Sequence, residues 1–196
     1  MKKWVIAVLA FGFVCVLAWT AADLPARPAN ARSLPQVAAL DRIVIPVAGI
    51  RTDELRDNFS DARSGHVHGA IDIMAPRGTP VLAAVDGSIR KLFTSRAGGL
   101  TIYEFDQAGS MSYYYAHLDH YVDGLREGRE VHRGDVIGYV GSTGNAPAQA
   151  PHLHFAISVL PATKEWWKGE AINPYPALMQ RGVTVAVDRV ISTAGR

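Results

Sequence analysis

Cysteine is almost absent from this chain, which has Cys15 alone among its 196 residues. No disulfide can form within the chain, and a metal site built from several thiolates is excluded. The residues before Cys15 lack the small, leucine-led pattern of a lipoprotein cleavage site, so we do not expect lipidation. Because the rest of the chain has no cysteine, an oxidising compartment would not harm it.

A strong charge of either sign is also lacking. The chain has 20 Lys and Arg against 18 Asp and Glu, a formal net charge of +2, and the basic residues form no cluster. Nucleic acid is therefore not expected as a partner. With 48% apolar and 19% charged residues the chain can bury a core, and its length allows one ordinary domain with extensions.

Only the N-terminus carries a long hydrophobic run. Lys2 and Lys3 precede an uncharged, largely apolar stretch from Trp4 to Trp19. A basic segment before such a run is typical of an export signal, although this run is shorter than the ~20 residues that span a bilayer. We predict that residues 1–22 are a signal peptide or an N-terminal membrane anchor with its lysines on the cytoplasmic side. The protein would then be periplasmic or in the cell envelope.

The remaining sequence predicts one β-dominated domain. Residues 23–40 are rich in Pro, Ala and Arg and are interpreted as a linker, residues 41–178 as the domain, and residues 179–196 as a tail without an assigned role. Short β-branched and aromatic runs separated by turn residues favour an all-β, antiparallel sheet or sandwich with a few short helices. The expected strands are Ile43–Val47, Val81–Val85, Ser88–Phe93, Leu100–Phe105, Met111–Ala116, Val136–Val140 and His152–Val159, and helical pieces are expected near Thr52–Arg56 and Tyr121–Arg126.

Two histidines are expected on one face of the last strand. Successive side chains alternate along a strand, so His152 and His154 project together while Leu153 and Phe155 enter the core. Two imidazoles on a rigid face suit metal binding or acid–base work. The alternative is an ordinary strand with two solvent-facing histidines.

A second pair of candidate ligands is His68 and Asp72. On a straight strand their side chains would be ~13 Å apart, too far for metal–ligand bonds of about 2.0–2.2 Å to one ion. A bend is therefore required, and Gly69 beside Ala70 can supply it. Two histidines and one aspartate would leave the fourth position of a tetrahedral ion open, which is typical of catalytic sites. The alternative for Asp72 is a turn residue bonded to backbone N–H groups.

A third segment contains Tyr113, Tyr115 and His117, which share one face if strand geometry persists. Tyr115 then either lines a cleft or packs in the core. The chain has no H-E-x-x-H helix, so the carboxylate base of many zinc proteases is missing. A histidine would have to move the proton instead.

Together these segments resemble the lysostaphin-type, or LytM-like, zinc endopeptidases that cut peptidoglycan. The similar blocks are His68 to Asp72, Tyr115 to Leu118 and His152 to Phe155, within a similarity that covers about Phe59 to Val159 in the family's order. The resemblance implies Zn2+ bound by His68, Asp72 and His154, with His117 and His152 as catalytic histidines that bind no metal. It also implies attack of a zinc-bound water on a peptide of the stem or cross-bridge, while leaving open which histidine is the general base.

The sequence leaves several alternatives. Some LytM-like domains have lost their ligands and activate a separate amidase, and a secreted protease acting on proteins is another option; the retained residues favour a peptidoglycan endopeptidase. Arg63 is interpreted as structural rather than as a substrate contact, and Trp166 with Trp167 as a plug on the sheet rather than a wall for glycan or peptide. His66, His120 and His132 match no family position and are interpreted as surface residues. The sequence does not indicate which bond is cut or the oligomeric state.

Overall fold

The computed structural model describes residues 43–63 and 65–181. The predicted signal peptide or anchor, the linker and most of the predicted tail lie outside these residues. No helix within the two described ranges is long and apolar enough to cross a membrane.

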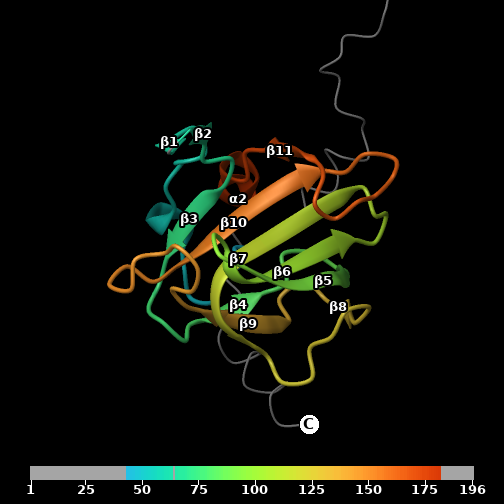
Figure 1. Ribbon diagram of the computed structural model, residues 1–196, viewed down its shortest axis with the longest axis horizontal. Helices are drawn as coiled ribbons and strands as arrows, with labels where there is room; N and C mark the ends of the chain where they lie inside the picture. The colour runs from blue at the N-terminus through green and yellow to red at the C-terminus, as the bar shows by residue number, and fades with distance from the viewer. Residues whose placement is uncertain (1–42, 64, 182–196) are drawn as a thin grey trace, which may run out of the picture. The chain divides into compact units, whose positions relative to one another are not determined.

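The described residues form an antiparallel sheet, as the all-β prediction requires (Figure 1). Its strands are hydrogen-bonded in the order β11 (Glu170–Ile172), β10 (His152–Val159), β7 (Met111–Tyr121), β6 (Gly99–Asp106), β5 (Gly87–Ser95) and β8 (Glu130–Val131). Three further strands join it: β3 (Ile71–Met74) pairs with β10, and β9 (Val136–Val140) pairs with both β7 and β4 (Pro80–Leu82). The remaining elements are the hairpin of β1 (Ala62–Arg63) and β2 (His66–Val67), the 3-10 helix η1 (Thr52–Glu54) and the helix α2 (Tyr175–Arg181).

Most predicted strands are confirmed, but of the predicted strand Val81–Val85 only Val81 and Leu82 belong to one, the short β4. β9 and β10 have the predicted bounds, and β5, β6 and β7 contain the predicted runs and extend them. The run 43–47 is wrong as a strand: it is buried, but it is joined to residues 80–84 by a single bridge, between Val47 and Val81, and one further backbone hydrogen bond, from Val44 to Ala84, instead of a continuous ladder. The helix near 121–126 is also wrong, because β7 continues through Tyr121 and a turn follows. The short β3 and β11 and the helix α2 were not predicted.

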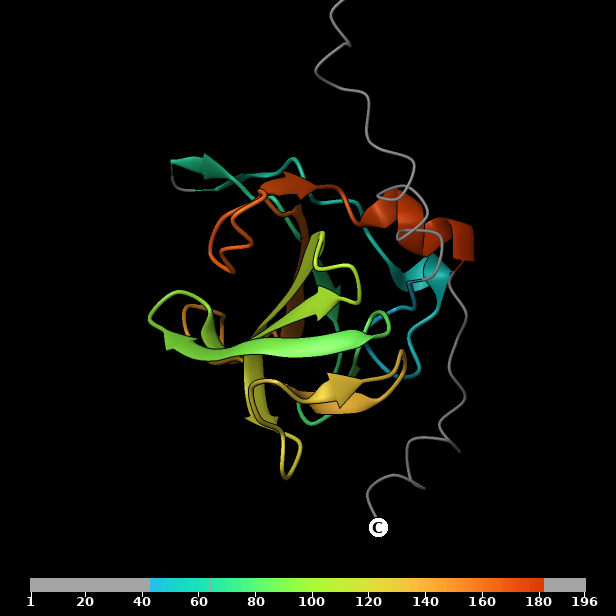
Figure 2. The ribbon, with the colours of Figure 1, turned by 90° about the vertical axis from the view of Figure 1, so that its right-hand side faces the viewer.

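The core fills one face of the long strands. On β10, Leu153, Phe155 and Ile157 are fully buried, as the predicted alternation requires. Each such side chain stabilises the fold by about 1.5–3 kcal/mol relative to an exposed one. Leu178 of α2 joins the same core. Figure 2 shows α2 on one side of the sheet and the loop between β10 and β11 on the other.

A buried carboxyl lies inside this core. Glu104 on β6 is completely buried, and its Oε2 accepts hydrogen bonds from the hydroxyl of Tyr115 and, at 3.3 Å, from the amide of Ala84. Burial raises its pKa from the ordinary value of 4.5 to about 8, because the low-polarity surroundings disfavour the charged form. The folded protein therefore keeps this carboxyl protonated over a range in which the unfolded chain does not.

We expect Glu104→Gln to remove a pH dependence of stability. The raised pKa means that Glu104 stabilises the fold most below about pH 4.5 and loses this contribution as the pH rises through about 8. The difference in unfolding free energy between wild type and variant should thus fall with rising pH, by up to about 1 kcal/mol per pH unit. Urea unfolding of both proteins at several pH values measures this difference, with a chelator present so that metal binding does not contribute. Glu130→Gln, at an exposed position, is the control. If its difference from wild type in unfolding free energy changed with pH as much as that of Glu104→Gln, the raised pKa of Glu104 would be contradicted.

Candidate metal centre

The pairing of two strands brings two of the predicted ligands side by side. In the antiparallel pair of β3 and β10, Asp72 lies directly opposite His154. His154 is also opposite Ala116 of β7, whose small side chain leaves room on this face. Because opposite residues of a ladder project to the same side, the carboxylate and the imidazole meet.

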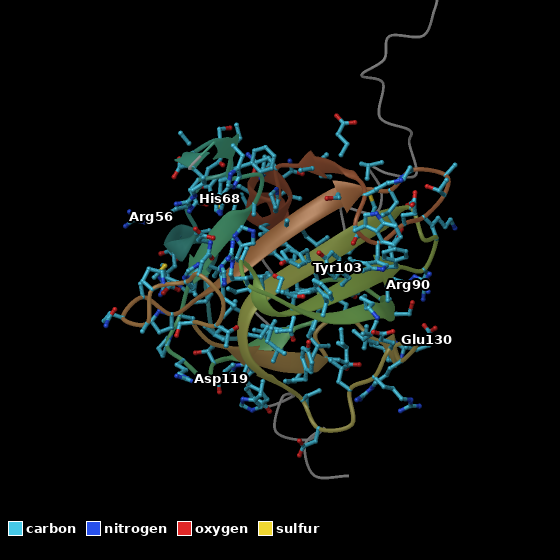
Figure 3. All side chains as sticks on the ribbon, viewed as in Figure 1. Arg56, His68, Arg90, Tyr103, Asp119 and Glu130 are labelled. Carbon is cyan, nitrogen blue, oxygen red and sulfur yellow. The ribbon has the colours of Figure 1, made fainter. Side chains whose placement is uncertain are left out.

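His68 reaches the same point through a bend at Gly69. It follows β2, and Gly69 has a φ of 66°, in the left-handed region that side chains other than glycine rarely adopt. The amide of Gly69 donates to the carbonyl of Phe59 at 3.0 Å, which fixes the turn. The predicted bend between His68 and Asp72 is therefore confirmed. Figure 3 shows the labelled His68 beside β3.

The three candidate ligand atoms form a nearly equilateral triangle. His68 Nε2 is 3.1 Å from His154 Nδ1 and 3.0 Å from Asp72 Oδ1, and the latter two atoms are 3.1 Å apart. In a tetrahedral zinc site with bonds of about 2.0–2.1 Å, neighbouring ligand atoms are about 3.3 Å apart. A zinc ion above the triangle fits this donor set, and within the described residues these are the three groups that could hold a metal ion together.

Neighbouring residues orient each of these donors. Asn58 contacts two of them: its carbonyl is 2.9 Å from His68 Nδ1, and its side-chain oxygen accepts the amide of Asp72 at 3.1 Å. With Nδ1–H bonded to a carbonyl, His68 directs the lone pair of Nε2 toward the triangle. Arg63 donates to the other carboxylate oxygen of Asp72 at 2.8 Å. Arg63 thus acts on the site directly, a role that sequence reasoning missed.

His117 and His152 lie beside the triangle. The ring of His117 is 4.9 Å from that of His152 and 5.6 Å from that of His154, measured between centroids. His117 Nδ1 is 2.8 Å from the carbonyl of Thr143, and His152 Nδ1 is 2.8 Å from that of Ala150. Both Nδ1–H groups can therefore donate to a carbonyl, which directs both Nε2 atoms away from these carbonyls, and His152 Nε2 lies 3.7 Å from Asp72 Oδ1.

His117 does not share a face with Tyr113 and Tyr115, so that prediction is wrong. The register between β6 and β7 shifts near His117, whose φ is 62°, and this bulge turns its ring toward the cleft. Tyr113 and Tyr115 remain fully buried in the core. Tyr114, between them, is the tyrosine that lines the cleft, because the regular part of the strand directs it to the opposite face.

Charge and burial shift two pKa values here. Burial raises the pKa of Asp72, but the hydrogen bond from His154 and the neighbouring charges outweigh it and lower the pKa to about 2. Burial is the main cause that lowers the pKa of His117 to about 4. Asp72 is thus an anion and His117 neutral near neutral pH.

All five predicted site residues line one cleft of about 460 Å³. His66, predicted to be a surface residue, also lines it, whereas His120 and His132 are exposed elsewhere. His120 stacks on Tyr139 and contacts Asp119 at 2.9 Å. The other residues of the wall are Arg63, Ala97, Gly98, Tyr114, Asn145, Ala146 and Pro147.

The model of peptidase family M23 matches residues 66–174, which is more than half of the chain. The chain belongs to this family. The predicted resemblance to lysostaphin-type peptidases is therefore confirmed, and the matched region contains all five candidate site residues.

Several M23 relatives are similar to this chain. The L-Ala--D-Glu endopeptidase of Bacillus subtilis is 34% identical over 138 residues, 66% of this chain and 41% of the relative. The DD-carboxypeptidase/endopeptidase Mpg of Neisseria meningitidis is 38% identical over 109 residues, 55% of this chain and 22% of the relative. The catalytic domain of lysostaphin from Staphylococcus simulans superposes with a TM-score of 0.53 at 30% identity, covering 63% of this chain and 90% of that domain. The chain thus spans less than half the length of these two curated relatives.

We expect Gly69→Ala to weaken zinc binding. A Cβ at this position meets no atom closer than 3.9 Å, so the cost is backbone strain of about 1–2 kcal/mol, which moves His68 relative to Asp72. Gly49→Ala is the control, since Gly49 has a φ of 79°, an open surrounding and no place in the cleft. Thermal unfolding measures the backbone strain in each variant, and zinc titration measures the affinity for the ion. Equal zinc affinity of the two variants would contradict the role of the bend.

Proposed function

We propose that this chain is a zinc-dependent endopeptidase that hydrolyses peptide cross-links of bacterial peptidoglycan. The observation that carries the proposal is the triangle of His68, Asp72 and His154 beside two histidines that are not part of it. Membership of family M23 and the peptidase names of its relatives support the same reaction class.

The chemistry divides between the metal and the chain. A bound zinc ion would polarise the scissile carbonyl and activate a water. His68, Asp72 and His154 would hold the ion, and their triangle leaves one side open toward the cleft. Arg63 keeps the second oxygen of Asp72 occupied, so a single carboxylate oxygen remains for the metal.

His117 and His152 would move the protons. Their carbonyl partners accept from Nδ1–H, so in the neutral ring Nε2 of either histidine can take a proton from the attacking water and return it to the leaving amine. The other, once protonated, can donate a hydrogen bond to the developing oxyanion. Their ring separation of 4.9 Å lets both reach one reacting carbonyl.

The proposed substrate requires an exported protein. Lys2, Lys3 and the apolar run after them support export to the periplasm or cell envelope, either with cleavage or with retention as an anchor. The alternative, a non-catalytic module that activates an amidase, is disfavoured because no candidate ligand or proton carrier is missing. A protease that acts on proteins instead of cell walls is a second alternative, and the digestion test below distinguishes it.

We expect site variants to fall into two groups. His154→Ala and Asp72→Ala should lose stoichiometric zinc, because two donors cannot retain the ion against dilute chelator. His117→Ala and His152→Ala should keep zinc and lose about 10²–10⁴-fold in kcat. Metal analysis of purified proteins and release of muropeptides from cell walls measure both properties.

The controls decide between the competing functions. His120→Ala changes a histidine outside the cleft and should leave zinc content and turnover unchanged. If zinc-loaded wild type released no muropeptides but cut proteins, the substrate would be protein and not peptidoglycan. Zinc-free, inert wild type that stimulates an amidase would overturn the hydrolase proposal, and loss of zinc in His152→Ala but not in His154→Ala would overturn the ligand assignment.

A further inference from the structure

A row of aromatic side chains crosses the sheet on the face that carries the metal centre. Tyr114 of β7 lies opposite Tyr103 of β6, and their ring centroids are 4.6 Å apart. Phe93 of β5 continues the row, because it is opposite Thr101, two residues before Tyr103, and so projects to the same side. In Figure 3, Tyr103 lies between His68 and Arg90 in the view.

Two tryptophans from the loop between β10 and β11 extend the row. The Trp166 ring is 4.8 Å from Tyr103 and 5.4 Å from Phe93, and Trp167 is 5.3 Å from Trp166. These contacts confirm part of the predicted plug, since Trp166 packs on the sheet. Trp167 does not, because 59% of its surface is exposed. We call Tyr103, Tyr114, Phe93, Trp166 and Trp167 the aromatic row.

The row is continuous with the metal centre. Tyr114 lines the cleft, and its ring is 6.0 Å from that of His154. From His154 to Trp167 each step between ring centroids is 4.6–6.0 Å. A ligand that leaves the cleft over Tyr114 can therefore continue along these rings.

Exposure makes the outer half of the row available to a ligand. Phe93 is 41% and Trp167 59% exposed, and both belong to the few large apolar side chains of the described residues that face solvent. Polar groups lie in the loop of Trp167: the Thr163 hydroxyl and the Lys168 ammonium both donate to Glu165 at 2.9 Å. Flat apolar rings beside hydroxyl and charged groups match a ligand with an apolar face and polar edges.

We propose that the aromatic row binds the glycan strand to which the cleaved peptide is attached. A pyranose ring has an apolar C–H face that stacks on aromatic rings and hydroxyl and acetamido edges that bond to polar neighbours. This inference rests on the proposed function, since it assumes that the scissile peptide lies at the metal centre.

The reach of a stem peptide favours sugar over peptide at the outer rings. An extended peptide spans at most about 3.3–3.6 Å per residue, so three or four residues reach from the metal past Tyr114 and Tyr103. The sugar that carries such a peptide then arrives at Phe93, Trp166 and Trp167. The inner rings contact the peptide, and the outer rings contact the glycan.

The test compares two substrates that differ only in the sugar. Cross-linked muropeptide dimers with their disaccharides and the same dimers freed of sugar are cleaved by wild type, Trp167→Ala and Trp166→Phe. Wild type should prefer the sugar-bearing dimer about 10-fold or more in kcat/KM, mainly through KM. Trp167→Ala should lose that preference and cleave the sugar-free dimer like wild type. Trp166→Phe, which keeps an aromatic ring, should retain most of it.

Met179→Ala is the matched control. Met179 is 41% exposed on α2, which lies across the sheet from the loop of Trp167, and its removal should change neither substrate (Figure 2). Equal cleavage of both dimers by wild type, or equal loss on both in Trp167→Ala, would overturn the glycan assignment.

A binding measurement separates this inference from the proposed hydrolysis. Wild type and Trp167→Ala are incubated with bead-immobilised glycan strands from which an amidase has removed the stem peptides, and the bound protein is measured. Glycan binding that is weakened about 10-fold in Trp167→Ala supports the inference even if neither dimer is cleaved, in which case the hydrolase proposal alone fails. No binding by wild type overturns the inference, whatever the cleavage result.

Discussion

The backbone pairing of β3 with β10 is the constraint on which the rest of the site depends. It places Asp72 opposite His154 through main-chain hydrogen bonds, independently of any metal. The bend at Gly69 then brings His68 to the same point, and Asn58 holds two of the three donors. The three donor atoms thus lie 3.0–3.1 Å from one another.

Much of the fold and of the centre could be predicted from the sequence. The alternation of Leu153 and Phe155 with the two histidines fixed the orientation of β10, and the distance argument required a bend between His68 and Asp72. Strands with long β-branched and aromatic runs were predicted correctly because periodicity identifies them. The short β3 and β11 were missed because three or four residues carry too little pattern, and their pairing partners decide their structure.

Other parts depend on tertiary contacts that periodicity does not contain. The bulge of β7 turns His117 to the face opposite to the one that strand alternation predicts, so alternation alone did not place it beside Tyr114 in the cleft. The ion pair of Arg63 with Asp72 joins a separate hairpin to β3, and nothing in the local sequence signals it. Likewise Trp166 and Trp167 reveal their position only once their loop is placed over Tyr103.

The ion pair of Arg63 with Asp72 also bears on which cations the centre can discriminate. With Oδ2 engaged by the guanidinium, the carboxylate cannot chelate through both oxygens, and the other two donors are nitrogens. Calcium and magnesium prefer oxygen ligands throughout a shell of six or more, whereas two of the three donors here are nitrogens. An ion that accepts nitrogen ligands and a low coordination number would therefore be favoured at this centre over the hard alkaline-earth ions.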